Sequence, residues 1–218
     1  MSRAIRIDFA RIDHVYQHNH ALERKTQILM RKNAIYDYRQ HLLESIFNIQ
    51  LGASDLDQTE QGKPYLNIEA KTHSKLAFNH SHSQNFYALA TSNGLADIGI
   101  DIEELDRRVR FEALAQHAFH PNELSKWHEL DQDKAYWFKV WTTKEAVLKA
   151  SGLGIRMSLK DLDTQVNPIQ NGGICQHPLV GVFAYQNYVL ANCVITVAWR
   201  SELSCKGFAF PKIEIIQH

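Results

Sequence analysis

The sequence predicts an α+β fold in which two similar units face each other across a cleft. Each half of the chain contains a long segment with apolar residues at helical spacing, and several short segments with the alternating or clustered apolar residues typical of strands. The halves pass through these segments in a similar order, although no sequence repeat is visible. We expect residues 1–97 and 98–218 to form the two units, with a site between them.

The first half is expected to begin with a strand followed by a long basic helix. Ile5, Ile7 and Phe9 alternate with polar residues, which predicts the strand. From Leu22 to Ile49, apolar residues recur at helical spacing with Arg and Lys between them, which predicts the helix. The polar stretch 52–61 is expected to be a loop. Two short strands are expected at Lys75–Phe78 and Phe86–Thr91, with the polar segment NHSHSQN between them.

The second half repeats this order loosely. Ile98–Glu103 is expected to be a strand, and helical material is expected from Pro121 to Ser151. Gly152 can end that helix in the left-handed conformation. Further strands are expected near 179–185 and 189–199.

Composition excludes several classes of protein. Of the 218 residues, 44% are hydrophobic and 22% charged, as in ordinary globular chains, and 24 Lys plus Arg balance 24 Asp plus Glu. No net field therefore attracts nucleic acid or an anionic membrane. The chain has neither a signal-peptide core nor an apolar window that could cross a membrane, so we expect a cytoplasmic protein. Cys175, Cys193 and Cys205 lack CxxC spacing and indicate neither disulfides nor a zinc site.

Two acids stand on one face of a predicted strand. In the segment IGIDIEE at 98–104, isoleucines alternate with a glycine and the acids, so Asp101 and Glu103 would point the same way. Such charges, about 7 Å apart, repel each other, and a divalent cation would offset the repulsion. Gly99 would leave room for a ligand to approach the backbone. The alternative is a solvated edge with two ordinary surface acids.

A third acid lies on the long helical segment of the second half. Glu145 shares a helical stripe with Phe138, Trp141 and Leu148, and Lys149 is one turn further along. A carboxylate buried among large apolar groups needs a metal, a strong partner or a raised pKa. The alternative is an exposed Glu–Lys pair at i,i+4.

Several groups in the first half could bind an anion. Arg39 lies on the predicted helix, Lys63 precedes Pro64 in GKPYL, and Ser81 and His82 belong to the polar NHSHS stretch. Because the net charge is zero, phosphates must be met by such local groups. His80 and His82 could instead be a pair of metal ligands on a strand, but no third ligand at a characteristic spacing accompanies them.

Five motifs carry a family resemblance. GKPYL, FNHSHS, IGIDIE, FHPNEL and WTTKEAVLKASGLGI, in this order and at these separations, resemble the 4′-phosphopantetheinyl transferases of the surfactin-synthetase-activating (Sfp) type. The likeness is clear from Gly62 to Ile155, where Ile155 replaces the family's frequent Leu. It implies a monomer of two similar α+β halves, the fold of these transferases, with coenzyme A in the cleft between them and Mg²⁺ on the second half.

By this resemblance, Asp101, Glu103 and Glu145 would hold Mg²⁺, and Lys149 would contact the pyrophosphate of coenzyme A. Lys63 and Pro64 would lie along its adenine and ribose. Ser81, His82 and Arg39 would meet its phosphates, the 3′-phosphate in particular. The alignment is not fixed around Arg24 and Lys25, which lie near the family's other contacts to that phosphate. Glu123 matches a family acid to which we assign no role.

The implied reaction moves the phosphopantetheine arm of coenzyme A to a serine of an apo acyl or peptidyl carrier protein. The serine hydroxyl would attack the β-phosphorus, with Glu145 or a metal-bound water taking its proton, and adenosine 3′,5′-bisphosphate would leave. Asp101, Glu145 and Lys149 would form the catalytic group. The motif WTTKEA is more similar to the branch of this family that modifies fatty-acid, polyketide or glycolipid carriers.

Two other functions remain open at this point. A metal-dependent phosphodiesterase or nuclease could use the same three acids to activate water. A module that binds coenzyme A or carrier proteins without catalysis could carry the same contacts. Incubation with Mg²⁺, coenzyme A and an apo carrier protein distinguishes these two functions from the transfer reaction.

Overall fold

The computed structural model describes residues 4–18, 21–52, 54–68, 76–154, 157–201 and 210–218. Lys75, Ile155 and Cys205, which the sequence analysis names, lie outside these residues.

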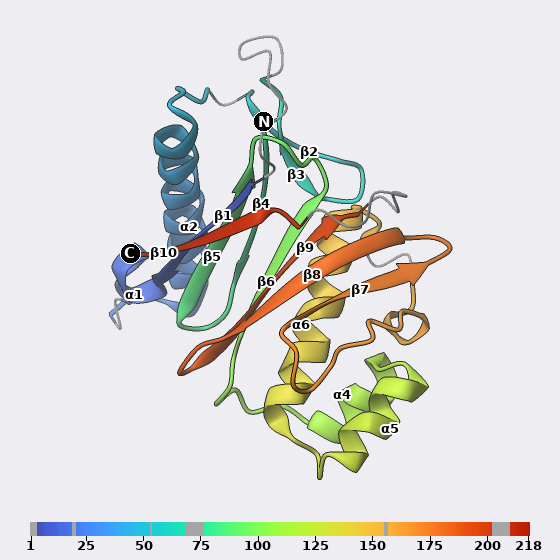
Figure 1. Ribbon diagram of the computed structural model, residues 1–218. Helices are drawn as coiled ribbons and strands as arrows, with labels where there is room; N and C mark the ends of the chain where they lie inside the picture. Colours follow the sequence, from blue (N-terminus) through green and yellow to red (C-terminus); the bar gives the residue numbers. More distant parts are fainter. Residues whose placement is uncertain (1–3, 19–20, 53, 69–75, 155–156, 202–209) are drawn as a thin grey trace.

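Two four-stranded sheets pack face to face, and each carries a long helix on its outer side (Figure 1). The first sheet has the order β10-β1-β5-β4 and the second the order β6-β9-β8-β7, while β2 and β3 form a separate ribbon. The strands are β1 Ala4–Arg11, β2 Leu56–Gln58, β3 Pro64–Leu66, β4 Ala77–His82, β5 Phe86–Ser92, β6 Ile98–Glu104, β7 Gly172–His177, β8 Gly181–Val189, β9 Cys193–Arg200 and β10 Lys212–Gln217.

A core of alternating apolar residues lies between the two sheets. Ile5 and Ile7 of β1 meet Ile98, Ile100 and Ile102 of β6, and all five are at most 1% exposed. The strand period of two places these side chains on one face of each strand. The predicted strands at the start of the chain and at IGIDIEE are therefore confirmed, and the isoleucines of β6 turn away from its acids.

The helices complete two outer cores. In one, α2 covers β4 and β5 through Ile35 and Leu43, and in the other, α6 covers β6 and β9 and touches β8. Ile28 and Leu29, at the start of α2, are 59% and 58% exposed, so this end of the predicted apolar stripe faces outward. The helices are α1 Ile12–Val15, α2 Arg24–Phe47, α4 Phe111–Ala118, α5 Pro121–Glu129 and α6 Lys134–Ser151, with the 3₁₀ turn η2 at Leu159–Asp161.

Four sequence expectations need correction. The expected loop 52–61 contains β2, whose three residues are too few to show a period. The polar stretch through His82 is part of β4 rather than a connection between strands. The helical material 121–151 is two helices, divided at 130–133, where Asp131 and Gln132 have positive φ. The later strands begin two and four residues after the expected positions, and α1, β3, α4, β7 and β10 were not expected.

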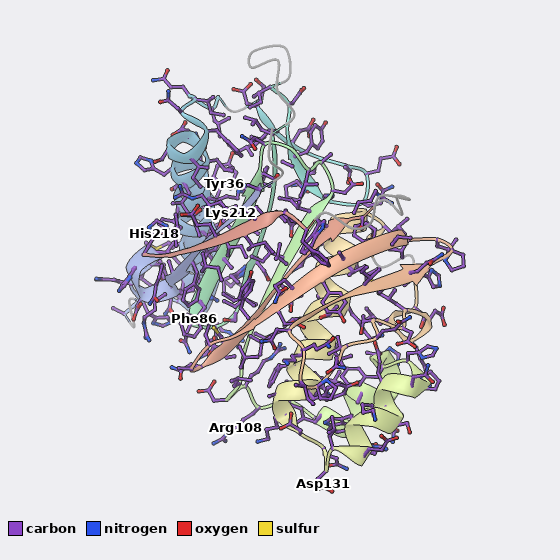
Figure 2. The ribbon with its side chains drawn as sticks, viewed as in Figure 1. Tyr36, Phe86, Arg108, Asp131, Lys212 and His218 are labelled. Carbon is purple, nitrogen blue, oxygen red and sulfur yellow. The ribbon has the colours of Figure 1, made fainter. Side chains whose placement is uncertain are left out.

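The C-terminal strand returns to the sheet of the first half. Residues 212–217 of β10 pair in parallel with 4–9 of β1, and Figure 2 shows Lys212 and His218 at the two ends of this segment. The division of the chain at residue 97 therefore does not coincide with the membership of the sheets. Within the described residues, every helix is too short or too polar to cross a lipid bilayer.

Candidate active site

The edges of the two sheets meet where β4 runs beside β6, and polar side chains bridge them. Asn79 Oδ1 of β4 accepts a hydrogen bond from the backbone N–H of Ile100 at 2.9 Å. Two residues on, Ser81 Oγ donates to Asp101 Oδ1 of β6 at 2.8 Å. The backbone N–H of Ile100 on this edge of β6 is thus satisfied by a side chain of β4. Asn79 and Ser81 are buried despite their polarity because they have these partners.

Lys149 of α6 completes the bridge. Its Nζ donates to Asp101 Oδ1 at 2.7 Å, to Ser81 Oγ at 3.0 Å and to the carbonyl oxygen of Ile100 at 3.2 Å. The three contacts use the three donors of the ammonium group. Lys149 therefore forms its ion pair with Asp101 instead of acting as an exposed partner of Glu145. The structure thus brings together Ser81, Asp101 and Lys149, which lie far apart in the sequence.

The other two predicted acids lie in the field of Asp101. Burial raises the pKa of Glu103, and the charge of Asp101 raises it further, whereas Arg107, its ion-pair partner, lowers it. Burial likewise raises the pKa of Glu145, followed by the charge of Asp101, against a lowering by Lys149. Asp101 is 5% exposed, so the alternative of two ordinary surface acids is wrong for this residue. Of the three conditions that a buried Glu145 could meet, a metal, a strong partner or a raised pKa, the chain by itself meets the third.

The acids suit a hard cation in chemistry, but they do not already form a closed metal site. In the part of the chain that the structure describes, no three His, Cys, Asp or Glu side chains form a group that could hold a metal ion. Asp101 Oδ2, however, is buried without a hydrogen-bond partner. Carboxylate oxygens are the ligands that Mg²⁺ prefers, and an unsatisfied buried oxygen is costly unless a ligand meets it. The residues present therefore fit such an ion, and the ligand set stays a prediction.

A cavity of about 520 Å³ opens beside the bridge. Lys63 and Pro64 line it from the side of the β2–β3 ribbon, and Glu145 and Lys149 line it from α6. Lys63 Nζ donates to the carbonyl oxygen of Ala150 at 2.6 Å, near the C-terminal end of α6, where the helix dipole favours a cation. Gly152 ends α6 with a φ of 72°, as the sequence predicted. Four of the predicted site residues thus share one cavity.

His82 and Glu103 line a second cavity, of about 840 Å³, together with Arg31 and Arg107. Arg39 lies apart from both cavities: its Nη1 is 2.9 Å from Nε2 of His80, and its guanidinium lies over the rings of Tyr36 and Phe78. Burial lowers the pKa of Arg39. The predicted phosphate contacts are therefore dispersed. Lys149 lines the first cavity and His82 the second, Ser81 lies in the bridge, and Arg39 is half-buried beside His80.

Gly99 serves a different purpose from the expected one. A Cβ built at this position would lie 2.2 Å from the carbonyl oxygen of Ala146 and 2.4 Å from the backbone nitrogen of Ala150. The backbone that approaches Gly99 is that of α6, not a ligand. The glycine allows the helix that carries Glu145 and Lys149 to lie directly on the strand that carries Asp101 and Glu103.

Sequence reasoning missed two supporting residues. One is Asn79, which accepts the hydrogen bond from the N–H of Ile100. Glu104 accepts hydrogen bonds from Ser83 Oγ at 2.7 Å and from the backbone and side chain of Asn85 at 2.6 and 2.7 Å, so it fixes the β4–β5 turn to β6. In the sequence, the role of Glu104 was indicated only by its place as the third acid of IGIDIEE.

Comparison with known proteins gives one consistent family. Residues 97–198, which include β6, α6 and the strands behind them, match the 4′-phosphopantetheinyl transferase superfamily. The chain is 33% identical over 164 residues to 4′-phosphopantetheinyl transferase HetI of Nostoc sp., a match that covers 73% of this chain and 68% of HetI. It is 29% identical to 4′-phosphopantetheinyl transferase gsp of Aneurinibacillus migulanus (61% and 52% covered) and 30% identical to AcpT of Escherichia coli (63% and 64% covered).

The matches therefore span two thirds of HetI and between half and two thirds of the other two relatives. The fold and the site define an α+β protein with acidic and cationic groups gathered at the junction of two sheets. The chain belongs to the 4′-phosphopantetheinyl transferase superfamily and is an enzyme of the transferase class.

Proposed function

We propose that this chain transfers the 4′-phosphopantetheine arm of coenzyme A to a serine hydroxyl of an apo carrier protein. The observation that carries the proposal is the bridge formed by Ser81, Asp101 and Lys149, which lies against a cavity large enough for part of a nucleotide. The family to which the chain belongs supports the same reaction.

Coenzyme A would lie across the junction of the sheets. Lys63 and Pro64, in the 520 Å³ cavity, would receive the adenine and ribose. Ser81 and Lys149 would meet the pyrophosphate beside Asp101. His82, which is exposed at the end of β4, would contact the 3′-phosphate. Arg39 would donate to the same phosphate the Nε–H that is buried without a hydrogen-bond partner.

Asp101, Glu103 and Glu145 would hold Mg²⁺, with Asp101 contributing the oxygen that has no hydrogen-bond partner. When bound, the ion supplies positive charge that stabilises the diphosphate as negative charge grows on the leaving phosphate. Burial raises the pKa values of Glu103 and Glu145, and the charge of Asp101 raises them further. This supports the assignment, because such a cluster is more stable with a cation than without one.

The side chains supply positioning, charge and a base. Lys149 presents a point charge to the diphosphate. The serine oxygen of the carrier forms a bond to the β-phosphorus as the bond from that phosphorus to the bridging oxygen breaks, and adenosine 3′,5′-bisphosphate carries the electron pair away. Glu145, which lines the cavity beside Lys149, would take the proton of the serine hydroxyl.

We also propose that the two halves, 1–97 and 98–218, are related by a pseudo-twofold axis and that the protein acts as a monomer in the cytoplasm. Each half supplies most of a four-stranded sheet and one long helix, and Cys175 and Cys193 are buried free thiols that suit a reducing compartment. Light scattering on the purified chain measures its oligomeric state.

The test is intact-mass spectrometry of an apo carrier protein after incubation with the enzyme, coenzyme A and Mg²⁺. A panel of fatty-acid, polyketide and nonribosomal-peptide carriers covers the possible acceptors. We expect at least one carrier to gain the mass of one phosphopantetheine, and EDTA to abolish the gain. Hydrolysis of coenzyme A with every carrier unmodified would favour the phosphodiesterase alternative, and binding of coenzyme A without any turnover would favour a binding module.

A further inference from the structure

A buried ion pair lies directly behind the catalytic face of α6. Lys144 Nζ is 2.7 Å from Glu123 Oε2, and the two side chains are 0% and 2% exposed. Lys144 immediately precedes Glu145, and Glu123 belongs to the first turn of α5. Both charges have therefore been removed from water next to the proposed site.

Lys144 also holds the segment that follows α6. Its Nζ donates to the carbonyl oxygen of Leu159 at 2.9 Å and to that of Leu162. Met157 and Leu159 of this segment line the 520 Å³ cavity, as Lys63 does. One ammonium group thus fixes both a wall of the cavity and the helix that carries Glu145 and Lys149.

Glu123 secures the same segment from the other end. Its Oε1 accepts hydrogen bonds from the backbone N–H of Thr164 at 2.8 Å and from Thr164 Oγ1 at 2.5 Å, and its Oε2 accepts one from the N–H of His120 at 2.8 Å. The pair therefore connects α5, α6 and residues 159–164. Such fully hydrogen-bonded geometry is what a buried ion pair needs to offset its desolvation.

The direction of Lys144 on the helix gives the pair a geometric consequence. Successive residues turn by about 100°, so Lys144 points roughly 140° away from Lys149 around the helix axis. A side chain anchored on the back of the helix limits rotation of the helix, and with it the direction of the side chains in front. Because a buried ion pair is by itself a weak source of stability, positioning accounts better for its presence here.

We propose that Glu123 and Lys144 are positioning residues that set the shape of the coenzyme A cavity and the orientation of Glu145 and Lys149. This inference rests on the proposed function. The residues touch no reacting atom, and they act through the Met157–Leu159 wall and through the rotation of α6.

The test compares Lys144→Met with the double variant Glu123→Gln/Lys144→Met, which leaves no unpaired buried charge. Lys139→Met is the matched control: Lys139 is a second buried lysine of α6, 5% exposed, but it donates to Pro168 O and Asn171 Oδ1 in a segment outside the cavity. For each protein, the melting temperature, the KM for coenzyme A, the kcat for carrier modification and the calorimetric affinity for coenzyme A are measured below the melting transition.

We expect both Lys144 variants to raise the KM and the dissociation constant for coenzyme A by about tenfold and to lower kcat by a similar factor, because small displacements of catalytic groups are costly. Lys139→Met should lower the melting temperature and leave KM and kcat unchanged. If the double variant folds and keeps wild-type KM and kcat, the positioning role is wrong while the proposed function stands. A wild-type protein that neither binds coenzyme A nor modifies any carrier would overturn both.

Discussion

Ser81 and Asp101 share a hydrogen bond of 2.8 Å across the junction of the two sheets, and Lys149 donates to both of them. The three residues come from β4, β6 and α6. The bridge therefore exists only when both sheets and the second helix are in place. Any change that separates α6 from β6 should reduce activity as well as stability.

The contact between Gly99 and α6 can be tested by adding one methyl group. In Gly99→Ala, the new Cβ would meet backbone atoms of Ala146 and Ala150 at 2.2 and 2.4 Å, so helix or strand must shift. Forced overpacking of this kind usually costs about 1–3 kcal/mol, and we expect the free energy of unfolding to fall by about 3 kcal/mol. Urea denaturation measures it.

Gly52→Ala is the control for that substitution. Its Cβ would lie 3.5 Å from Asp55 Oδ2, an ordinary contact with a side chain, and the free energy of unfolding should change little. Equal stability of the wild type and Gly99→Ala would show that α6 does not rest on β6 as described.

Mg²⁺ should stabilise the protein, and pH should control the effect. Burial and the charge of Asp101 raise the pKa values of Glu103 and Glu145 above the ordinary 4.5. Between that value and the raised values, the folded protein binds more protons than the unfolded chain, so stability falls as pH rises through this window. Above the window, the full repulsion is present and the cation offsets it.

At pH 7.5, Mg²⁺ at about 100 times its dissociation constant adds about 2.7 kcal/mol, which raises the melting temperature of a chain of this size by about 5 to 10 °C. The shift should shrink as the pH falls through the window, because protonated acids bind the ion poorly. Differential scanning fluorimetry with Mg²⁺, with EDTA and with NaCl of equal ionic strength measures the shift. An equal shift with NaCl would indicate general screening and contradict the metal site.

His82 should affect binding rather than chemistry. It is exposed at the end of β4, in the cavity that also contains Arg31, and we assign it to the 3′-phosphate. We expect His82→Ala to raise the KM for coenzyme A by about tenfold with kcat within about twofold, as loss of uniform binding does. His117→Ala, an exposed histidine of α4, should change neither value. A large fall in kcat at unchanged KM would instead mean that His82 takes part in the reaction.

Local periodicity was enough to predict β1, α2 and β6, because alternating isoleucines and helical spacing are visible without any partner. The polar stretch of β4 was not predicted as strand because Asn79 and Ser81 are buried only through bonds to Ile100 and Asp101, which lie about twenty residues later. No local pattern reveals such partners.

The motifs of the sequence predicted the residues of the candidate site. They did not predict the residues that hold the site in place. Gly99 indicates an open backbone in the sequence, but the space is filled by α6. Glu123 had no role until its partner Lys144, 21 residues later, was seen beside it. Glu123 also closes a capping box with His120 at the start of α5, which the sequence does not indicate because the usual N-cap is Ser, Thr, Asp or Asn.

The most direct test of the account is the rate at which Asp101→Asn converts an apo carrier to its holo form, measured by intact mass at saturating coenzyme A and Mg²⁺ beside the wild type. The amide keeps the shape of the side chain and can still accept from Ser81 and Lys149. Because the charge of the ion pair with Lys149 is lost, the melting temperature is measured as well, to show that the variant is folded. We expect the rate to fall by at least about a hundredfold, because the buried oxygen without a partner is then no longer an anionic ligand. A folded Asp101→Asn protein with the wild-type rate would contradict the site.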